Sequence, residues 1–78
     1  MANDELEMME AWNASRPNLL DKALGLSDQD HYSIPTVYES AWRAARKNRY
    51  ALPAAKARAE IAVRKFINTH QPKATLGL

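Results

Sequence analysis

The sequence predicts an all-α fold, a small domain of four helices in which the last two form a basic helical hairpin. Two observations carry this prediction. Apolar residues recur at the spacing of a helix face, and prolines and capping residues stand where helices are expected to begin. The helices are taken below in chain order.

The chain of 78 residues has room for one domain, which we expect over residues 1–72, with residues 73–78 as a flexible C-terminal tail. Apolar residues make up 46% of it, enough for a folded chain. Because many of them are Ala, a small number of large side chains must share one core. A partner or a second copy could supply buried area that the monomer lacks.

The first helix is expected from a cap at Asn3 or Asp4 to about residue 14, with acids in its first turns, where the helix dipole favours them. The residues on one side of it are Leu6, Met9 and Asn13, with Met8 and Trp12 next to them. We interpret this stripe as core, because so small a chain can hardly spare Trp12. An acidic helix that carries Met and Trp could also serve as a docking peptide.

A short second helix is expected over residues 17–24. Pro17 suits the first turn of a helix, and Gly25 suits the left-handed residue that follows a helix end. Leu26 would then fold back onto Leu20 in a Schellman motif.

Residues 27–34 are polar and predict a loop. Asp28, Asp30 and His31 within it could in principle ligate a metal ion. Because no second cluster completes a coordination shell, we interpret the segment as a solvated linker and expect no metal site.

The third helix is expected to start at Pro35 and Thr36, since Thr36 and Glu39 have the spacing of a capping box, and to end near residue 48 or 49. The residues expected on one face are Val37, Ala41, Ala44, Ala45 and Asn48, with Tyr38 and Trp42 on the flank. We interpret both aromatic side chains as core.

The fourth helix has the clearest pattern and is expected from Pro53, in its first turn, to residue 69 or 70. The residues that follow the spacing of one helix face are Ala55, Ala59, Ala62, Val63 and Phe66, with Ile67 at the edge. Ile61 lies off this stripe among charged residues. It is either the edge of a wider core or an exposed contact residue.

Charge divides the chain into two halves. Residues 1–42 carry eight acids and two bases, whereas residues 43–78 carry nine bases and one acid, so the net charge of +2 hides a strong dipole along the sequence. Either the halves pack together and their fields partly cancel, or each half meets a partner of opposite charge.

The sequence carries no catalytic signature. It has no cysteine and only two glycines, and neither His31 nor His70 is placed to activate a serine. We therefore expect a protein that is not an enzyme and has no cofactor and no small-molecule substrate. No apolar run is long enough to span a membrane, and the acids from Asp4 to Glu10 do not suit a signal peptide, so we expect a cytoplasmic location.

Two stretches, residues 6–13 (LEMMEAWN) and 33–42 (SIPTVYESAW), resemble small phage-encoded transcription regulators that bind host RNA polymerase. Together they cover under a quarter of the chain. The resemblance implies a non-enzymatic inhibitor or antiterminator that occupies a polymerase surface or displaces another factor. It assigns no functional residue.

The basic hairpin is the expected binding face, because residues 42–65 hold eight basic side chains and only Glu60 opposes them. The side chains expected to contact a partner are Arg43, Arg46, Lys47, Arg49, Tyr50, Lys56, Arg58, Arg64 and Lys65. The competing interpretation is that Lys and Arg only solvate the outer faces of the helices.

Three kinds of partner fit such a face. The leading hypothesis is docking on RNA polymerase or another nucleic-acid machine. The alternative is direct contact with DNA or RNA by a degenerate helix-turn-helix, in which the first turn of the last helix would meet the bases through Ala54, Ala55, Lys56 and Ala57. A third hypothesis is an antitoxin-like protein that binds its partner through the acidic N-terminal helix.

Overall fold

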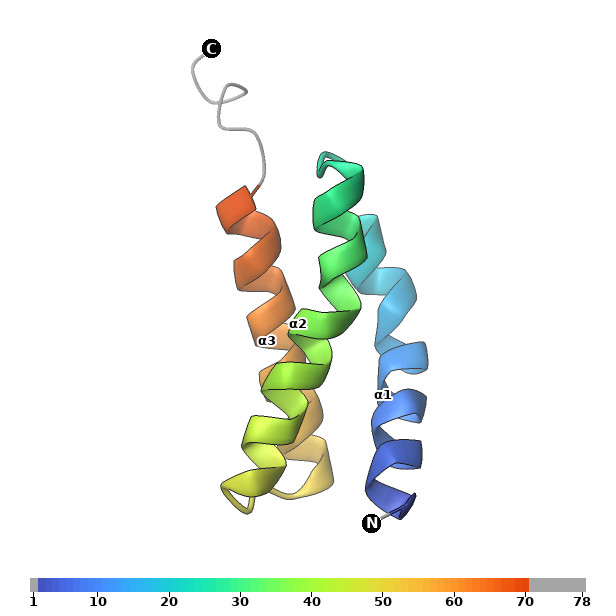
Figure 1. Ribbon diagram of the computed structural model, residues 1–78, viewed down its shortest axis with the longest axis vertical. Helices are drawn as coiled ribbons and strands as arrows, with labels where there is room; N and C mark the ends of the chain where they lie inside the picture. The colour runs from blue at the N-terminus through green and yellow to red at the C-terminus, as the bar shows by residue number, and fades with distance from the viewer. Residues whose placement is uncertain (1, 71–78) are drawn as a thin grey trace.

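The computed structural model describes residues 2–70, which form three α-helices and no strand (Figure 1). Helix α1 spans Ala2–Asp21, α2 spans Asp28–Lys47 and α3 spans Leu52–His70. Helices α2 and α3 form an antiparallel hairpin, and α1 lies along one side of it (Figure 1). The all-α class is confirmed, whereas the predicted count of four helices is wrong. The tail expected at residues 73–78 lies outside the described residues.

Helix α1 continues through Pro17, where the sequence predicted a break between two helices. A proline in a helix interior removes one backbone hydrogen bond and costs about 3 kcal/mol. Buried residues on both sides of Pro17 offset this cost, since Met8, Ser15 and Leu19 are all packed inside the molecule. Tertiary packing therefore joins two segments that local signals separate.

The packed face of α1 differs from the predicted one. Leu6 and Met9, expected in the core stripe, are exposed. Met8 is buried in their place, and Trp12 packs against the core with its ring centroid 5.1 Å from that of Tyr38. The interpretation of Trp12 as a core residue is confirmed.

Helix α2 begins at Asp28, so the predicted loop at residues 27–34 and the predicted start at Pro35 and Thr36 are both wrong. Ser27 is the N-cap, and its side-chain oxygen accepts a hydrogen bond of 3.2 Å from the backbone N–H of Asp30. The acids of this segment lie in the first helical turn, where the helix dipole favours them. The fully buried Ile34 anchors the segment in the core.

The Schellman motif predicted at Gly25 occurs at the other connection. No described glycine has a positive φ, whereas Arg49 has φ 71°. The N–H of Tyr50 donates to the carbonyl of Ala45 and the N–H of Arg49 donates to that of Arg46, both at 3.0 Å, which is the bonding pattern of this motif. The tight turn of the hairpin is therefore built around an arginine.

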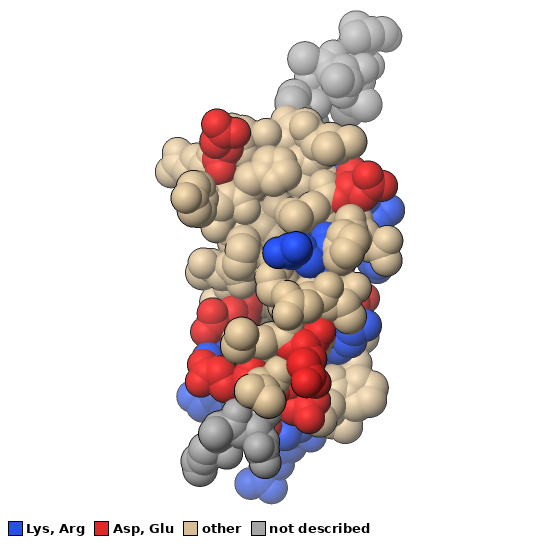
Figure 2. Space-filling model, turned by 90° about the vertical axis from the view of Figure 1, so that its right-hand side faces the viewer, with Lys and Arg blue, Asp and Glu red and all other residues tan. Residues whose placement is uncertain are grey.

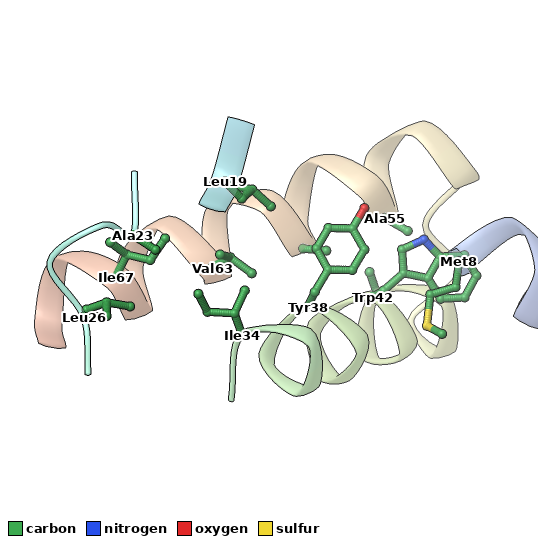
Figure 3. Close-up of a cluster of buried hydrophobic side chains, with 12 residues drawn as sticks. Met8, Leu19, Ala23, Leu26, Ile34, Tyr38, Trp42, Ala55, Val63 and Ile67 are labelled. Atoms are coloured by element: carbon green, nitrogen blue, oxygen red, sulfur yellow. The ribbon is translucent and has the colours of Figure 1, made fainter. Parts of the chain in front are cut away.

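The core lies mainly between α2 and α3, with α1 covering one edge (Figure 3). The buried residues of the hairpin are Ile34, Tyr38, Trp42 and Ala45 from α2 and Ala55, Ala59, Val63 and Ile67 from α3. The stripe predicted for the last helix is confirmed at Ala55, Ala59 and Val63. On α2 the aromatic residues form the centre of the packed face, as their interpretation as core requires, but Ala44 is exposed.

Candidate docking surface

The α2–α3 hairpin has two faces with different chemistry. On the side of the molecule where α1 lies, acidic and basic side chains lie next to each other over the lower half (Figure 2). The opposite face holds an open groove of about 370 Å³ to which α1 contributes no lining residue. We call this the open groove. Its lining residues are Ala41, Ala44, Ala45, Asn48, Tyr50, Arg58, Ile61, Ala62 and Lys65.

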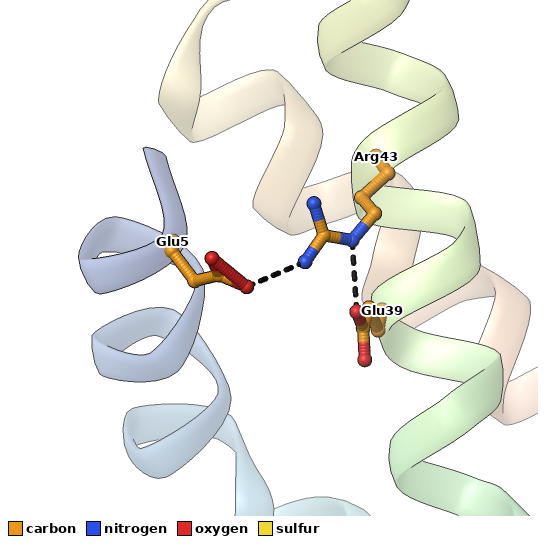
Figure 4. A network of polar contacts seen from close by, with 3 residues as sticks. All are labelled: Glu5, Glu39 and Arg43. Carbon is orange, nitrogen blue, oxygen red and sulfur yellow. Dashed lines mark hydrogen bonds and ion pairs between the residues drawn. The ribbon is translucent and has the colours of Figure 1, made fainter. Parts of the chain in front are cut away.

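Arg43 belongs to the face that α1 covers. Its guanidinium donates hydrogen bonds to Glu39 in the same helix and to Glu5 in α1, both at 2.8 Å (Figure 4). These bonds raise the pKa of Arg43 above its ordinary value, with Glu39 as the larger cause. The acidic N-terminal segment therefore already supplies the anion that the sequence analysis sought in an external partner.

Arg46 also pairs with an acid of α1, and it makes further contacts with the hairpin turn and with Trp42. Its Nη2 lies 3.2 Å from Asp4 Oδ1, and its Nη1 donates a bond of 2.8 Å to the backbone oxygen of Tyr50. The guanidinium carbon stands 5.9 Å from the centroid of the Trp42 ring. Arg46 thus ties the start of α1 to the end of α2 and to the hairpin turn, which is a structural role.

A polar joint connects α1 to α3 further along the same face. Ser15 Oγ donates a bond of 2.5 Å to Glu60 Oε2, and Lys56 Nζ lies 3.2 Å from the same oxygen. Burial raises the pKa of Glu60, but the bonds from Ser15 and Lys56, together with the positive charges of Lys56 and Arg64, outweigh burial, so the pKa lies below its ordinary value. Lys56, predicted as a contact residue, is therefore engaged in an ion pair within the chain.

The hydroxyl of Tyr38 lies in the interior near this joint. It has no hydrogen-bond partner of standard geometry among the described residues. Burial raises the pKa of the Tyr38 phenol, and the Ser15 hydroxyl offsets part of that rise. Because Tyr38 is 1% exposed and packs among the buried hydrophobic residues, we assign this side chain to the core.

The nine predicted contact residues do not form one face. Arg43, Arg46 and Lys56 lie toward α1 in internal ion pairs. Only three of the nine line the open groove, namely Tyr50, Arg58 and Lys65. The others lie elsewhere: Lys47 lines a hollow beside Trp42 and Arg43, Arg64 lines one with Lys22 and Ile67, and Arg49 forms the turn.

The open groove combines apolar and cationic groups. Ile61 is 58% exposed, which decides between the two interpretations of it in favour of an exposed residue. Tyr50 is 37% exposed, and the guanidinium carbon of Arg58 lies 4.4 Å from its ring centroid. Between residues 2 and 70, neither Arg58 nor Lys65 forms an ion pair. The open groove therefore presents exposed apolar side chains beside basic side chains that are not neutralised by an ion pair within the described helices.

Sequence reasoning missed the α2 side of the groove. The residues expected together on one face of this helix are Val37, Ala41, Ala44, Ala45 and Asn48, and only Ala45 of these five is buried. The available signal was the pair of large aromatic residues, Tyr38 and Trp42. Once these define the centre of the packed face, Ala44 falls on its outer side.

Other kinds of site find no support in the part of the chain that is described. No three His, Asp or Glu side chains within residues 2–70 come close enough together to hold a metal ion. None of the three helices combines the length and the apolar character that crossing a membrane requires.

Comparison with protein families found no matching family, and searches of curated proteins and of solved structures found no match either. The function is therefore argued from the geometry above.

Proposed function

We propose that this chain is a small regulatory binding protein that acts in the cytoplasm by docking on a nucleic-acid machine, without catalysing a reaction. RNA polymerase is the partner that we favour, because of the resemblance of residues 6–13 and 33–42 to polymerase-binding phage regulators. The observation that carries the docking proposal is the open groove, where exposed Ile61 and Tyr50 lie beside Arg58 and Lys65.

The composition of the groove favours a protein partner. Tyr and Arg are enriched among the residues that dominate binding energy at protein interfaces, and the stacked pair of Tyr50 and Arg58 supplies both. An exposed Ile in the lining of a groove has little use in a surface that only contacts phosphates, which is built from charged and polar groups. A protein surface that carries both acidic and apolar side chains would complement the basic and the apolar residues of the groove.

Direct DNA binding by a helix-turn-helix has less support. That motif needs the first turn of its second helix to be free to enter the major groove. Here Ala55 is fully buried and Lys56 is paired with Glu60. Helices α2 and α3 also run antiparallel and side by side, whereas the helices of that motif cross at a steep angle (Figure 1).

The test is direct binding to purified bacterial RNA polymerase core enzyme, immobilised and titrated with the chain. We expect wild-type binding, and a loss of at least about tenfold in affinity for Ile61→Asp. Leu24→Asp is the matched control, because Leu24 is also an exposed apolar residue, at 79%, and lies outside the open groove. It should leave the affinity unchanged.

Two results would contradict the proposal. One is the absence of wild-type binding to the polymerase at micromolar concentration, and the other is equal binding by Ile61→Asp and wild type. The DNA alternative is measured in parallel with duplex DNA. It requires an affinity that falls steeply with salt and a slope that becomes shallower in Lys65→Ala.

A further inference from the structure

We infer that the open groove receives a single α-helix of the partner, one with a narrow apolar stripe flanked by acidic side chains. This inference rests on the proposed docking function and names the form of the docked segment. Three features support it: the charge of the groove, the exposed Ile61 in its lining and the way in which α1 covers the other face of the hairpin.

The charge of the groove is one-sided. None of its lining residues is acidic, and Arg58 and Lys65 stand on its α3 side without an ion pair inside residues 2–70. Two cations without an ion pair in this part of the chain, beside the exposed Ile61, favour a partner that has carboxylates on either side of an apolar contact. A partner with basic flanks would meet repulsion from both.

The other face of the hairpin shows how this chemistry is satisfied within the chain. There α1 is an acidic helix, and its Asp4 and Glu5 pair with Arg46 and Arg43 of α2. The same helix places Met8 in the core and packs Trp12 against it. The open groove offers the same combination on the opposite side of the same two helices, so a docked acidic helix would complete a bundle of four.

The dimensions of the groove suit a short helical segment. Its lining on α2 runs from Ala41 to Asn48, which corresponds to about 10 Å at the rise of an α-helix. The α2 side presents Ala41 and Ala44, whose small side chains let a helix backbone approach closely. Ile61, 58% exposed, can then pack into the apolar stripe of about two turns of the partner helix.

A second copy of this chain is a poorer occupant. Its acidic helix is α1, and two of the acids in the first turns of that helix are already paired, Asp4 with Arg46 and Glu5 with Arg43. To present these two carboxylates to the groove of a neighbour, α1 would have to give up these pairs. A partner helix whose carboxylates form no ion pairs of their own would lose no such interaction on binding.

The test is a titration of the ¹⁵N-labelled chain with a capped synthetic peptide of about three heptads, with Ala and Leu at the a and d positions and Glu at e and g. The matched peptide carries Lys in place of every Glu. We expect the acidic peptide to shift the amide signals of Ala41, Ala44, Ile61 and Lys65, and the Lys peptide to bind at least about tenfold more weakly.

Charge reversal makes the test specific. Lys65→Glu should weaken the acidic peptide about tenfold and strengthen the Lys peptide, whereas Lys47→Glu, an exposed lysine outside the groove, should change both by less than about twofold. Circular dichroism confirms that each variant remains folded. Equal binding of the two peptides, or no signal shift in the groove, would overturn the inference. So would self-association of the chain through the groove in sedimentation experiments.

The outcome is separable from that of the polymerase experiment because the peptides contain no polymerase sequence. If Ile61→Asp abolishes polymerase binding but the acidic peptide leaves the groove unperturbed, only the helical form of the partner is wrong. If the peptide binds as expected and the polymerase does not, the helix inference stands and the proposed function is wrong.

Discussion

Ser15 of α1 and Glu60 of α3 are joined by a hydrogen bond of 2.5 Å across 45 positions of sequence. Ser15 is a buried polar residue, and the carboxylate that it contacts also pairs with Lys56. The bond holds α1 against the hairpin two residues before Pro17, the proline in the interior of the helix. It therefore makes a direct test of how firmly the acidic helix is attached.

Ser15→Ala should destabilise the fold by about 1–2 kcal/mol, because it leaves a half-buried carboxylate without one of its donors. Urea unfolding followed by circular dichroism measures the loss. Ser40→Ala is the control, since Ser40 is exposed on α2 and should change stability by less than about 0.5 kcal/mol. Equal stability of Ser15→Ala and wild type would show that the bond contributes nothing to the attachment of α1.

The lowered pKa of Glu60 predicts how stability depends on pH. Burial raises this pKa, and the bonds from Ser15 and Lys56 together with the charges of Lys56 and Arg64 lower it by more, so the folded value lies below the unfolded value of about 4.3. The charged carboxylate therefore stabilises the fold fully above about pH 4.3, and this stabilisation is lost as the pH falls through the folded pKa.

Glu60→Gln removes the titrating group and should flatten this dependence. We expect the difference in unfolding free energy between wild type and Glu60→Gln to shrink between about pH 6 and about pH 3. Glu10→Gln, at an exposed position of α1 outside this joint, is measured beside it as the control for loss of a surface carboxylate. A constant offset for Glu60→Gln would contradict the prediction.

Tyr38→Phe is expected to leave the fold as stable as wild type, or more stable by up to about 2 kcal/mol. The reason is that Tyr38 is 1% exposed and its hydroxyl is buried without a hydrogen-bond partner of standard geometry in the described region. The ring contact with Trp12 is retained by Phe. Thermal unfolding of Tyr38→Phe beside Tyr32→Phe, in which the tyrosine is exposed, provides the comparison. A loss above about 1 kcal/mol would mean that the hydroxyl is bonded.

The helical class and the last helix could be predicted from the sequence because local and tertiary signals agree there. From Ala55 to Val63 the small and apolar residues repeat at one spacing, and Pro53 falls in the first turn. At Pro17 and Pro35 the signals disagree. Each proline lies inside a helix, held there by buried neighbours such as Leu19 and Ile34, and a local rule cannot weigh that packing.

The division of the basic residues between two faces was also beyond local reasoning. The sequence shows that Arg43 and Arg46 are basic, but their acidic partners in α1 stand 38 and 42 positions away. Which bases are neutralised depends on where α1 lies relative to the hairpin. One of the two interpretations of the charge pattern was that the acidic and basic halves pack together. The pairs of Arg43 with Glu5 and of Arg46 with Asp4 show this packing between α1 and α2.

The left-handed backbone of Arg49 yields the last prediction. Its φ of 71° costs a residue with a Cβ about 1–2 kcal/mol relative to glycine, so Arg49→Gly should raise the unfolding free energy by about 1 kcal/mol. Gly25→Ala is the matched control, because Gly25 has no positive φ and the substitution should be neutral or slightly stabilising. Chemical denaturation of both variants measures the two effects.

The same substitution separates stability from function. Arg49 is exposed, forms no ion pair within residues 2–70 and adjoins Tyr50 at the end of the open groove. If the arginine is kept in a strained conformation for its charge, Arg49→Gly should be more stable than wild type and bind the acidic peptide more weakly. If the variant gains stability and binds equally well, the strain at Arg49 serves no contact in the groove. If the variant is less stable than wild type, the positive φ of Arg49 does not destabilise the fold as we expect.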